Sequence, residues 1–224
     1  MTAPVLRLTD VVRVFPSGNK KRTVLKGVTC DFEEGRVYSV VGPSGSGKTT
    51  LLALAGGLDA PTSGTVSFRG RDVADIGLAA YRNKNVATVF QSLNLLGYLT
   101  ATQNITSAME ITGVRGVSHK RRAAELLDLL GIDETDRRRR PARLSGGQQQ
   151  RVAIARALAC DVDVLLADEP TGSLDQDTAG EIIETFRRLA HEEGKCVVIV
   201  THSPQVAAAS DEVLHLRRGK LGRR

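Results

Sequence analysis

The sequence predicts an α/β fold in which a parallel sheet carries an antiparallel β subdomain and a helical subdomain. Three observations support this prediction. A glycine-rich segment, residues 42–49, lies between an apolar strand pattern at 37–41 and a helix pattern that follows it. The runs 162–167 and 196–200 are apolar without alternation, as parallel strands buried on both faces are. A helical pattern between these two runs predicts a parallel strand–helix–strand unit.

The first third of the chain is rich in β signals. Short runs at 5–8, 11–15, 23–25, 28–32 and 64–68 are separated by Gly, Pro, Ser and Asn at 16–19 and 60–64. These runs predict an antiparallel layer beside the strand at 37–41.

The middle of the chain, from about Gln91 to Ala159, is predicted to be mostly helical. Ser118 is placed to cap a helix over 119–130 that Gly131 ends, and Ser145 to cap the next helix. A further helix is expected at about 178–193, ended by Gly194. No linker is long enough to divide the chain, so residues 1–224 are expected to form one domain. Its core spans about 1–90 and 160–224, and its helical subdomain about 91–159.

The composition sets limits on the class of protein. The 224 residues are 41% hydrophobic and 25% charged, an ordinary soluble mixture. No apolar run approaches 18 residues and the start lacks an apolar signal-peptide core, so a cytoplasmic location is expected. The three cysteines lack metal-ligand spacing, which indicates reduced, structural thiols: Cys30, Cys160 and Cys196.

The net charge of +6 permits a nucleic acid, an anionic membrane surface or a nucleotide as partner. Much of the excess lies in short basic runs, including 20–22, 119–122 and 137–140. The simplest interpretation of each run is a solvated face.

The glycine-rich segment has the pattern of a phosphate-binding loop, G-x-x-x-x-G-K-[ST], followed by a helix. Glycines let backbone N–H groups wrap around a polyphosphate, and the helix N-terminus favours the same anion. Lys48 is placed to reach the β- and γ-phosphates, and the hydroxyl of Thr49 to hold Mg²⁺. The predicted nucleotide-binding residues are Gly42, Pro43, Ser44, Gly45, Ser46, Gly47, Lys48, Thr49 and Thr50.

Hydrolysis requires a metal ligand and a proton acceptor in addition to a phosphate-binding loop. Two acidic residues at the end of a buried strand are predicted to provide them. Asp168 ends the strand and is the expected Mg²⁺ partner, while Glu169 is placed to accept a proton from an attacking water. Both would lie at the edge of the sheet where the phosphate loop lies.

A second helix start, in the segment L-S-G-G-Q at 144–148, also has the features of an anion site. Gly146 and Gly147 disfavour a helix and are explained if N–H groups there approach an anion closely. Because the chain already has one phosphate loop, two copies of the protein are expected to share each nucleotide.

Together these motifs resemble the ATP-binding cassette (ABC) ATPases, a family of P-loop NTPases, over essentially the whole chain. The loop at 42–49 is similar to the Walker A motif, 144–148 to the signature motif and 165–169 to Walker B. Gln91 matches the Q-loop, 173–175 (Ser-Leu-Asp) the D-loop and His202 the switch histidine. All six occur in the order of the family.

The resemblance implies a site completed by a second copy in a head-to-tail dimer. ATP and Mg²⁺ are the implied cofactors, with Lys48, Gln91, Glu169 and His202 as catalytic residues and Thr49, Gln91 and Asp168 around the metal ion. Phe15 would stack on adenine, where tyrosine is commoner in the family. The partner copy would contribute Ser145 and Gly147, and Gly146, Gln148 and Asp175 are further implied nucleotide-binding residues.

The resemblance further implies a membrane permease subunit with an extracytoplasmic domain, which would hold the protein at the inner face of the cell membrane. Segments 90–101, 144–156 and 168–175 are similar to lipoprotein-release, macrolide-efflux and cell-division ATPases; bacitracin-type resistance ATPases are close neighbours. The leucines at 93, 95, 96 and 99 would receive the permease, although they also fit the protein's own core.

An alternative is a soluble ABC ATPase that acts on nucleic acid or ribosomes, with which the charge is compatible. Such members carry two cassettes or long coiled-coil insertions, which this chain lacks, and no direct nucleic-acid contact is expected. A P-loop kinase is excluded because segment 144–148 and His202 would have no role.

Overall fold

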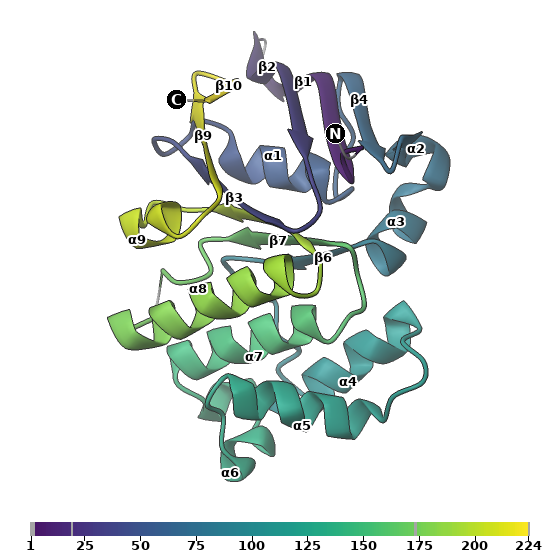
Figure 1. Ribbon diagram of the computed structural model, residues 1–224. Coiled ribbons are helices and arrows are strands. Elements are labelled where there is room, and N and C mark those ends of the chain that lie inside the picture. The colour runs from purple at the N-terminus through teal and green to yellow at the C-terminus, as the bar shows by residue number, and fades with distance from the viewer. Residues whose placement is uncertain (1–2, 19, 173, 224) are drawn as a thin grey trace.

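The computed structural model describes residues 3–18, 20–172 and 174–223, which form two sheets with helices around them (Figure 1). The larger sheet is six-stranded, in the order β10-β9-β3-β8-β7-β6. Its strands are β3 (Arg36–Val41), β6 (Val86–Val89), β7 (Val164–Asp168), β8 (Cys196–Val200), β9 (Glu212–Arg217) and β10 (Lys220–Arg223). All neighbouring pairs are parallel except β9 and β10, as the strand–helix–strand pattern predicted for β7 and β8.

The smaller sheet is antiparallel, in the order β2-β1-β4-β5. Its strands are β1 (Leu6–Ser17), β2 (Lys20–Phe32), β4 (Ser63–Phe68) and β5 (Arg71–Asp72). The antiparallel layer was predicted, but as more and shorter runs. The paired strands continue through bulges, with Asp10 and Gly27 at positive φ (47° and 69°), so each pair of predicted runs is one long strand.

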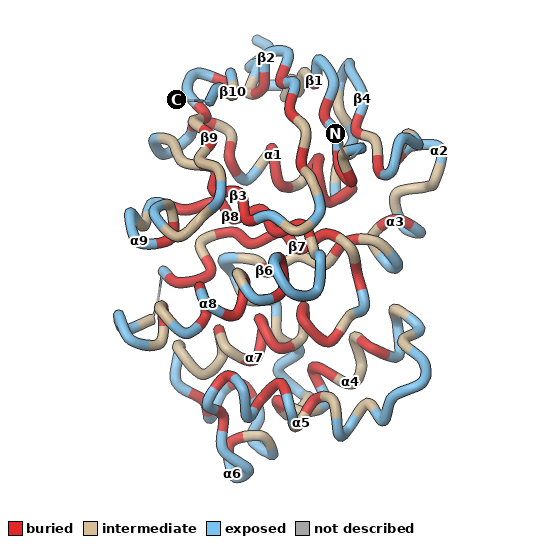
Figure 2. Tube along the Cα trace, in the orientation of Figure 1, coloured by how far each residue is buried: buried red, intermediate tan, exposed pale blue. Residues whose placement is uncertain are grey.

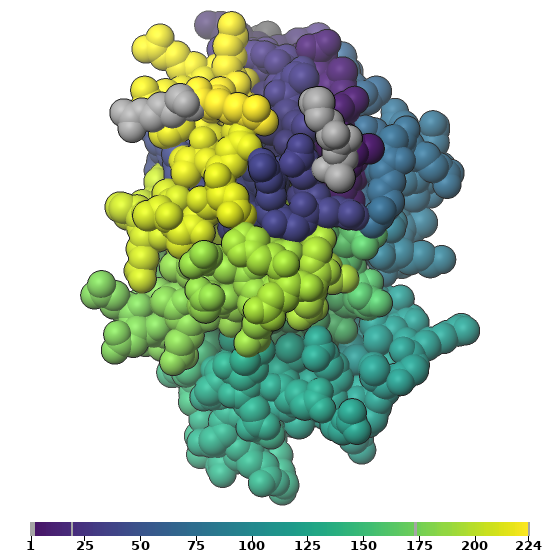
Figure 3. All heavy atoms as spheres, in the orientation of Figure 1, coloured from purple at the N-terminus to yellow at the C-terminus, as the bar shows by residue number. Residues whose placement is uncertain are grey.

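The helices cover both faces of the six-stranded sheet. They are α1 (Lys48–Ala55), α2 (Val73–Ile76), α3 (Leu78–Lys84), α4 (Ala101–Thr112), α5 (His119–Leu129), α6 (Glu134–Arg137), α7 (Gly146–Leu158), α8 (Gln176–His191) and α9 (Pro204–Ala208), with a 3₁₀ turn at Pro141–Arg143. Figure 3 shows the helical segment at the end of the molecule opposite the antiparallel layer. Among the described residues, no helix combines the length and apolarity needed to cross a membrane.

Two hydrophobic clusters lie on opposite faces of the larger sheet, and alternate residues of each strand point to them. In β8, Val197 and Ile199 pack with α7 and α8, while Val198 and Val200 pack with α1 and the antiparallel layer. Figure 2 shows the resulting buried strands at the centre of the molecule. The unalternating apolar runs therefore mark strands with two covered faces, as predicted.

The predicted helix starts after Ser118 and Ser145 are confirmed, and the middle of the chain is mostly helical as predicted, with a loop before its first helix. Ser118 and Ser145 accept N-cap hydrogen bonds from the backbone, and Gly131 follows α5 at φ 65°. Residues 91–100 form an irregular loop that ends where α4 begins. Leu93 and Asn94 have positive φ (58° and 49°), a conformation no helix accommodates.

Candidate nucleotide-binding site

The residues predicted for nucleotide chemistry meet at one edge of the parallel sheet. The phosphate loop follows β3, Gln91 follows β6, Asp168 ends β7 and His202 follows β8. Because the carboxyl ends of parallel strands meet at one edge, these segments converge there. They enclose a cleft of about 600 Å³ lined by Ser44, Gly45, Lys48, Thr49, Gln91, Gln150, Asp168, Glu169, Gly172 and His202.

The phosphate loop needs its glycines for two physical reasons. Gly47 caps α1 with φ 107°, and Gly45 has φ 72°, both in the region that favours glycine. A Cβ on Gly42 would lie 2.2 Å from the backbone oxygen of Leu216, so the loop is also packed closely against β9. The sequence pattern of the loop and its backbone conformation therefore both indicate a backbone that surrounds an anion.

Lys48 lies at the centre of the cleft. Its ammonium donates to the backbone oxygens of Gly42 (2.8 Å) and Pro43 (3.2 Å), and its Nζ is 3.3 Å from Nε2 of His202. The residue is only 7% exposed. A bound phosphate in this cleft would therefore meet a cation that the loop already holds in place.

Glu169 occupies a strained position opposite the loop. Its φ is 49°, and its N–H donates to the backbone oxygen of Val200 (2.9 Å). Its Oε2 accepts from the N–H of His202 (3.2 Å), while Oε1 lies 3.5 Å from Nε2 of the same histidine. Oε1 is buried and lacks a hydrogen-bond partner among the described residues. An acceptor in this state is suited to a water molecule in the cleft.

The residues expected around Mg²⁺ offer oxygen ligands to the cleft from α1, from the segment after β6 and from the end of β7. These are the hydroxyl of Thr49, the side-chain amide of Gln91 and the carboxylate of Asp168. No cluster of three His, Cys, Asp or Glu that would hold a metal occurs in the part of the chain that the structure describes. The donor set fits Mg²⁺, which takes few protein ligands and completes its shell with water and phosphate oxygens.

Two residues of the cleft were missed at the sequence level, Gln150 and Gly172. The side-chain amide of Gln150 donates to the backbone oxygens of Pro170 and Glu169, at 3.3 Å to Glu169. The backbone N–H of Gly172 donates to the backbone oxygen of Glu169 (3.2 Å). Both fix the turn that aims Glu169. Gln150 carries no sequence signal, because its contact depends on how α7 packs beside β7, whereas the bond of Gly172 is a local turn.

The signature segment does not line the cleft of its own chain. Ser145 caps α7 and exchanges hydrogen bonds with Gln148, whose side chain also donates to the buried carboxylate of Asp136. Gly146 has open space around its Cα, and Gly147 lies near Leu174. The segment is thus a braced helix start separate from the phosphate loop.

Asp175 and Phe15 also lie outside the lining of the cleft. Asp175 caps α8, and hydrogen bonds from the backbone and side chain of Thr178 hold the pKa of its carboxyl below the usual range. Ser173, beside it, is outside the described residues. Phe15 is half-buried on β1, with the guanidinium of Arg13 4.5 Å from its ring centroid. Adenine would therefore need the other face of this ring.

Comparisons with known proteins identify the family. A family model described as ABC transporter matches residues 25–172, most of the chain. The chain belongs to the ABC transporter family. Its resemblance to the ABC ATPases and the expected α/β cassette fold are both confirmed, and the protein is an ATP-binding ABC ATPase.

Several relatives of the ABC ATPase cover nearly all of its chain. An uncharacterized ABC transporter ATP-binding protein, YclH of Bacillus subtilis, is 50% identical over 91% of this chain and 90% of its own. One from Thermotoga maritima is 47% identical over 97% and 93%. The macrolide export ATP-binding/permease protein MacB of Escherichia coli K12 is 43% identical over 98% of this chain but only 34% of its own.

Solved structures share the fold of the ABC ATPase closely. The bacterial ABC transporter cassette MJ0796, solved as a dimer, superposes with a TM-score of 0.92 at 38% identity and covers 97% of both chains. The same cassette in a post-hydrolysis state, bound to ADP and Pi, gives a TM-score of 0.92 at 37% identity.

Proposed function

We propose that this ABC ATPase is a motor subunit that dimerises head to tail on ATP and drives a separate membrane permease with an extracytoplasmic domain. One observation carries the proposal: the signature helix start is braced and does not line the cleft of its own chain. In a head-to-tail pair, the partner's Ser145, Gly147 and neighbouring residues would close each cleft. The dimeric structure of MJ0796 supports the pairing of two copies.

Within the cleft, the proposed roles follow from the contacts. Lys48 and the loop N–H groups bind the β- and γ-phosphates and stabilise charge as it moves to the leaving oxygen. Glu169 accepts a proton from the attacking water through its unpartnered Oε1, and His202 holds that carboxylate in place. Thr49, Asp168 and Gln91 would hold Mg²⁺, which supplies further neutralisation of the phosphate charge when bound.

ATP links chemistry to movement because it contacts both chains only in the closed dimer. A ligand that binds one state more tightly shifts the population towards it, and hydrolysis removes that preference. The dimer therefore closes with ATP and opens after hydrolysis.

The loop at 91–100 is the proposed docking surface for the permease. The guanidinium of Arg156 donates to the backbone oxygens of Leu93 (2.7 Å) and Asn94 (2.6 Å), and the buried Asn104 accepts from the N–H of Leu96 (2.8 Å). These anchors hold the loop in a fixed shape. A permease as the partner is supported by the similarity to MacB, because the name of MacB describes an ATP-binding part and a permease part in one protein.

The apolar side chains of this loop divide between the core and the surface. Leu95 packs against the core cluster, and Leu93 and Leu99 are half-buried. Leu96 is 39% exposed and Tyr98 is 69% exposed. Of the four predicted leucines, only Leu96 therefore belongs to the proposed docking surface, and Tyr98 is the second residue of that surface.

Polar substitution of this surface is expected to uncouple the permease. Leu96→Asp combined with Tyr98→Ala removes the apolar contact, so we expect at least a tenfold loss of co-purification with the proposed permease subunit. Leu129→Asp on α5 is a matched control, because Leu129 is 42% exposed. Unchanged co-purification of the double variant, with ATP hydrolysis intact, would count against this docking surface.

The basic run at 137–140 gives little support to the nucleic-acid alternative. Arg137 pairs with Asp128, Arg138 with Glu134 and Arg139 with Asp136, so most of its charge is neutralised within the chain. ATP hydrolysis by the purified protein is accordingly expected not to respond to added DNA or RNA. The proposed location is the inner face of the cell membrane, through the permease.

A further inference from the structure

The phosphate loop borders a second hollow, which Asp168 and Glu169 do not line. This hollow has a volume of about 260 Å³ and is lined by Arg22, Val24, Gly45, Gly47, Lys48, Thr49 and Thr50. It shares Gly45, Lys48 and Thr49 with the cleft described above. The two hollows therefore adjoin along one loop, and a polyphosphate held by that loop would border both.

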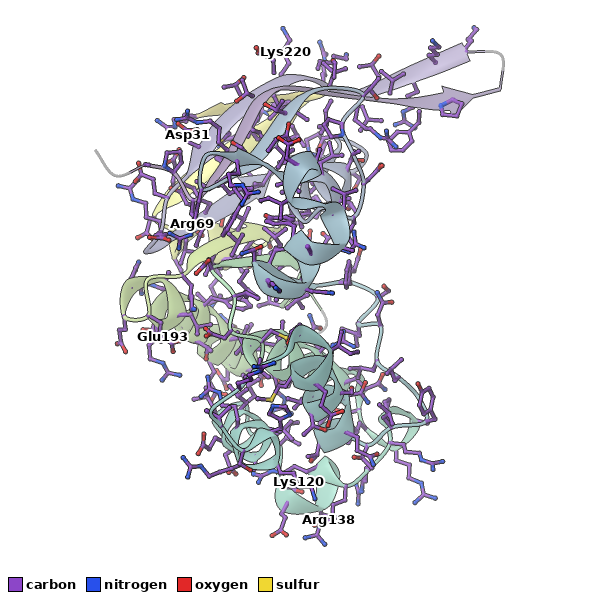
Figure 4. The ribbon with its side chains drawn as sticks, turned by 90° about the vertical axis from the view of Figure 1, so that its right-hand side faces the viewer. Asp31, Arg69, Lys120, Arg138, Glu193 and Lys220 are labelled. Carbon is purple, nitrogen blue, oxygen red and sulfur yellow. The ribbon has the colours of Figure 1, made fainter. Side chains whose placement is uncertain are left out.

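Arg22 on β2 brings a cation to this second hollow. The β1–β2 hairpin projects beyond the rest of the molecule (Figure 4). Its Nη2 lies 4.0 Å from the position that a Cβ of Gly45 would take. Three other arginines of the neighbouring strands, Arg7, Arg13 and Arg223, form ion pairs. Arg22 forms none with any described residue. Its guanidinium thus faces the loop without a carboxylate to neutralise it.

The register of the hairpin places Arg22 beside the aromatic ring proposed to stack on adenine. Phe15 and Arg22 are direct partners in the β1–β2 ladder, and directly opposite residues of an antiparallel pair share a face. Base, sugar and first phosphate of a nucleotide on Phe15 would thus pass Arg22 before the remaining phosphates reach Lys48.

The electrostatics of the hollow favour an anion. No acidic side chain lines it within the described ranges, and α1 begins there without an acidic residue in its first turn. The helix N-terminus, Lys48 and Arg22 therefore act on the same space. A guanidinium presents paired N–H donors that match two phosphate oxygens, which suits it to the diphosphate group of a nucleotide.

We propose that Arg22 is a nucleotide-binding residue that clasps the phosphate nearest the nucleoside, at the hairpin side of the phosphate loop. This inference rests on the ATP-binding function of the chain and adds a residue from outside the family motifs. Since ATP and ADP share that phosphate, Arg22 binds both alike. It holds the ground state and the transition state equally, so it lowers KM without changing the turnover number.

The test compares Arg22→Gln with Lys21→Gln. Lys21 is an exposed cation one position away, and adjacent strand residues point to opposite faces, so both changes remove one charge while only the first alters the hollow. Loss of a charged hydrogen bond predicts that Arg22→Gln binds ADP and ATP about tenfold more weakly by calorimetry. KM for ATP rises in parallel, the turnover number stays within twofold, and Arg22→Lys recovers part of the loss.

Several results would overturn the assignment. One is an affinity for ADP that falls equally in the two glutamine variants, which would indicate only the general field of the hairpin. Another is a loss confined to ATP, which would place Arg22 at the γ-phosphate instead. If the wild-type protein binds ADP and hydrolyses ATP while Arg22→Gln has unchanged nucleotide affinity, only the role of Arg22 is refuted. Wild-type protein that binds neither nucleotide refutes the proposed function as well.

Discussion

Replacing Glu169 by glutamine is expected to reduce ATP turnover about 100- to 10,000-fold, the usual contribution of a general base. Glutamine keeps the size and the acceptor oxygen of the side chain but cannot take a proton from water. The hydrogen bond from the N–H of His202 can persist, so ATP should still bind. Steady-state phosphate release and ATP titration of the same preparation measure the two effects separately.

A carboxylate elsewhere on the surface provides the control for this change. Glu110→Gln on α4 removes the same charge at an exposed position outside the cleft and should leave turnover within twofold. A Glu169→Gln variant that retains a tenth or more of the wild-type rate would contradict the role assigned to Oε1, because water would then be activated elsewhere.

Replacing Lys48 by alanine is expected to lower turnover about 100- to 1,000-fold, as removal of one donor to a developing charge does. Unlike Glu169→Gln, this change should also weaken ATP binding, because the ammonium contacts the phosphates before and during the reaction. Phosphate release and calorimetric titration with ATP distinguish the two variants. Lys20→Ala, an exposed cation of the hairpin outside both hollows, serves as the matched control.

Lys48 also holds the loop through the backbone oxygens of Gly42 and Pro43, so the stability of the variant matters. Thermal unfolding shows whether the chain remains folded at the assay temperature. A folded Lys48→Ala protein with wild-type ATP affinity would contradict the placement of the phosphates in this cleft.

The strand ends explain why so much of the cleft could be predicted from the sequence. Asp168 and His202 each follow an unbroken apolar run, and such runs mark parallel strands whose ends share an edge. The glycines at 45 and 47 indicate a backbone at positive φ, which other residues disfavour. These signals are local, so no knowledge of distant packing was needed.

The residues that escaped prediction act through distant parts of the chain. Gln150 reaches the turn at Glu169 across a packed helix and strand, and Arg156 fixes the loop at Leu93 from more than sixty positions away. In the sequence, the residues around Asp10 and Gly27 have the features of strand ends. Each strand continues past its bulge because it pairs with the neighbouring strand on both sides, and the sequence alone does not show that pairing. The link between Phe15 and Arg22 likewise exists only in the register of the hairpin.

The central claim, that each ATP is held by the phosphate loop of one chain and the signature segment of another, is tested most directly by measuring molecular mass. Light scattering on Glu169→Gln with ATP and Mg²⁺ should give twice the 24.0 kDa of the single chain. Adding Ser145→Arg should leave ATP binding by the phosphate loop intact but return the mass to 24.0 kDa, because a bulky side chain blocks the shared site. A double variant that still doubles its mass with ATP, or a Glu169→Gln protein that stays at the single-chain mass, would contradict the shared site.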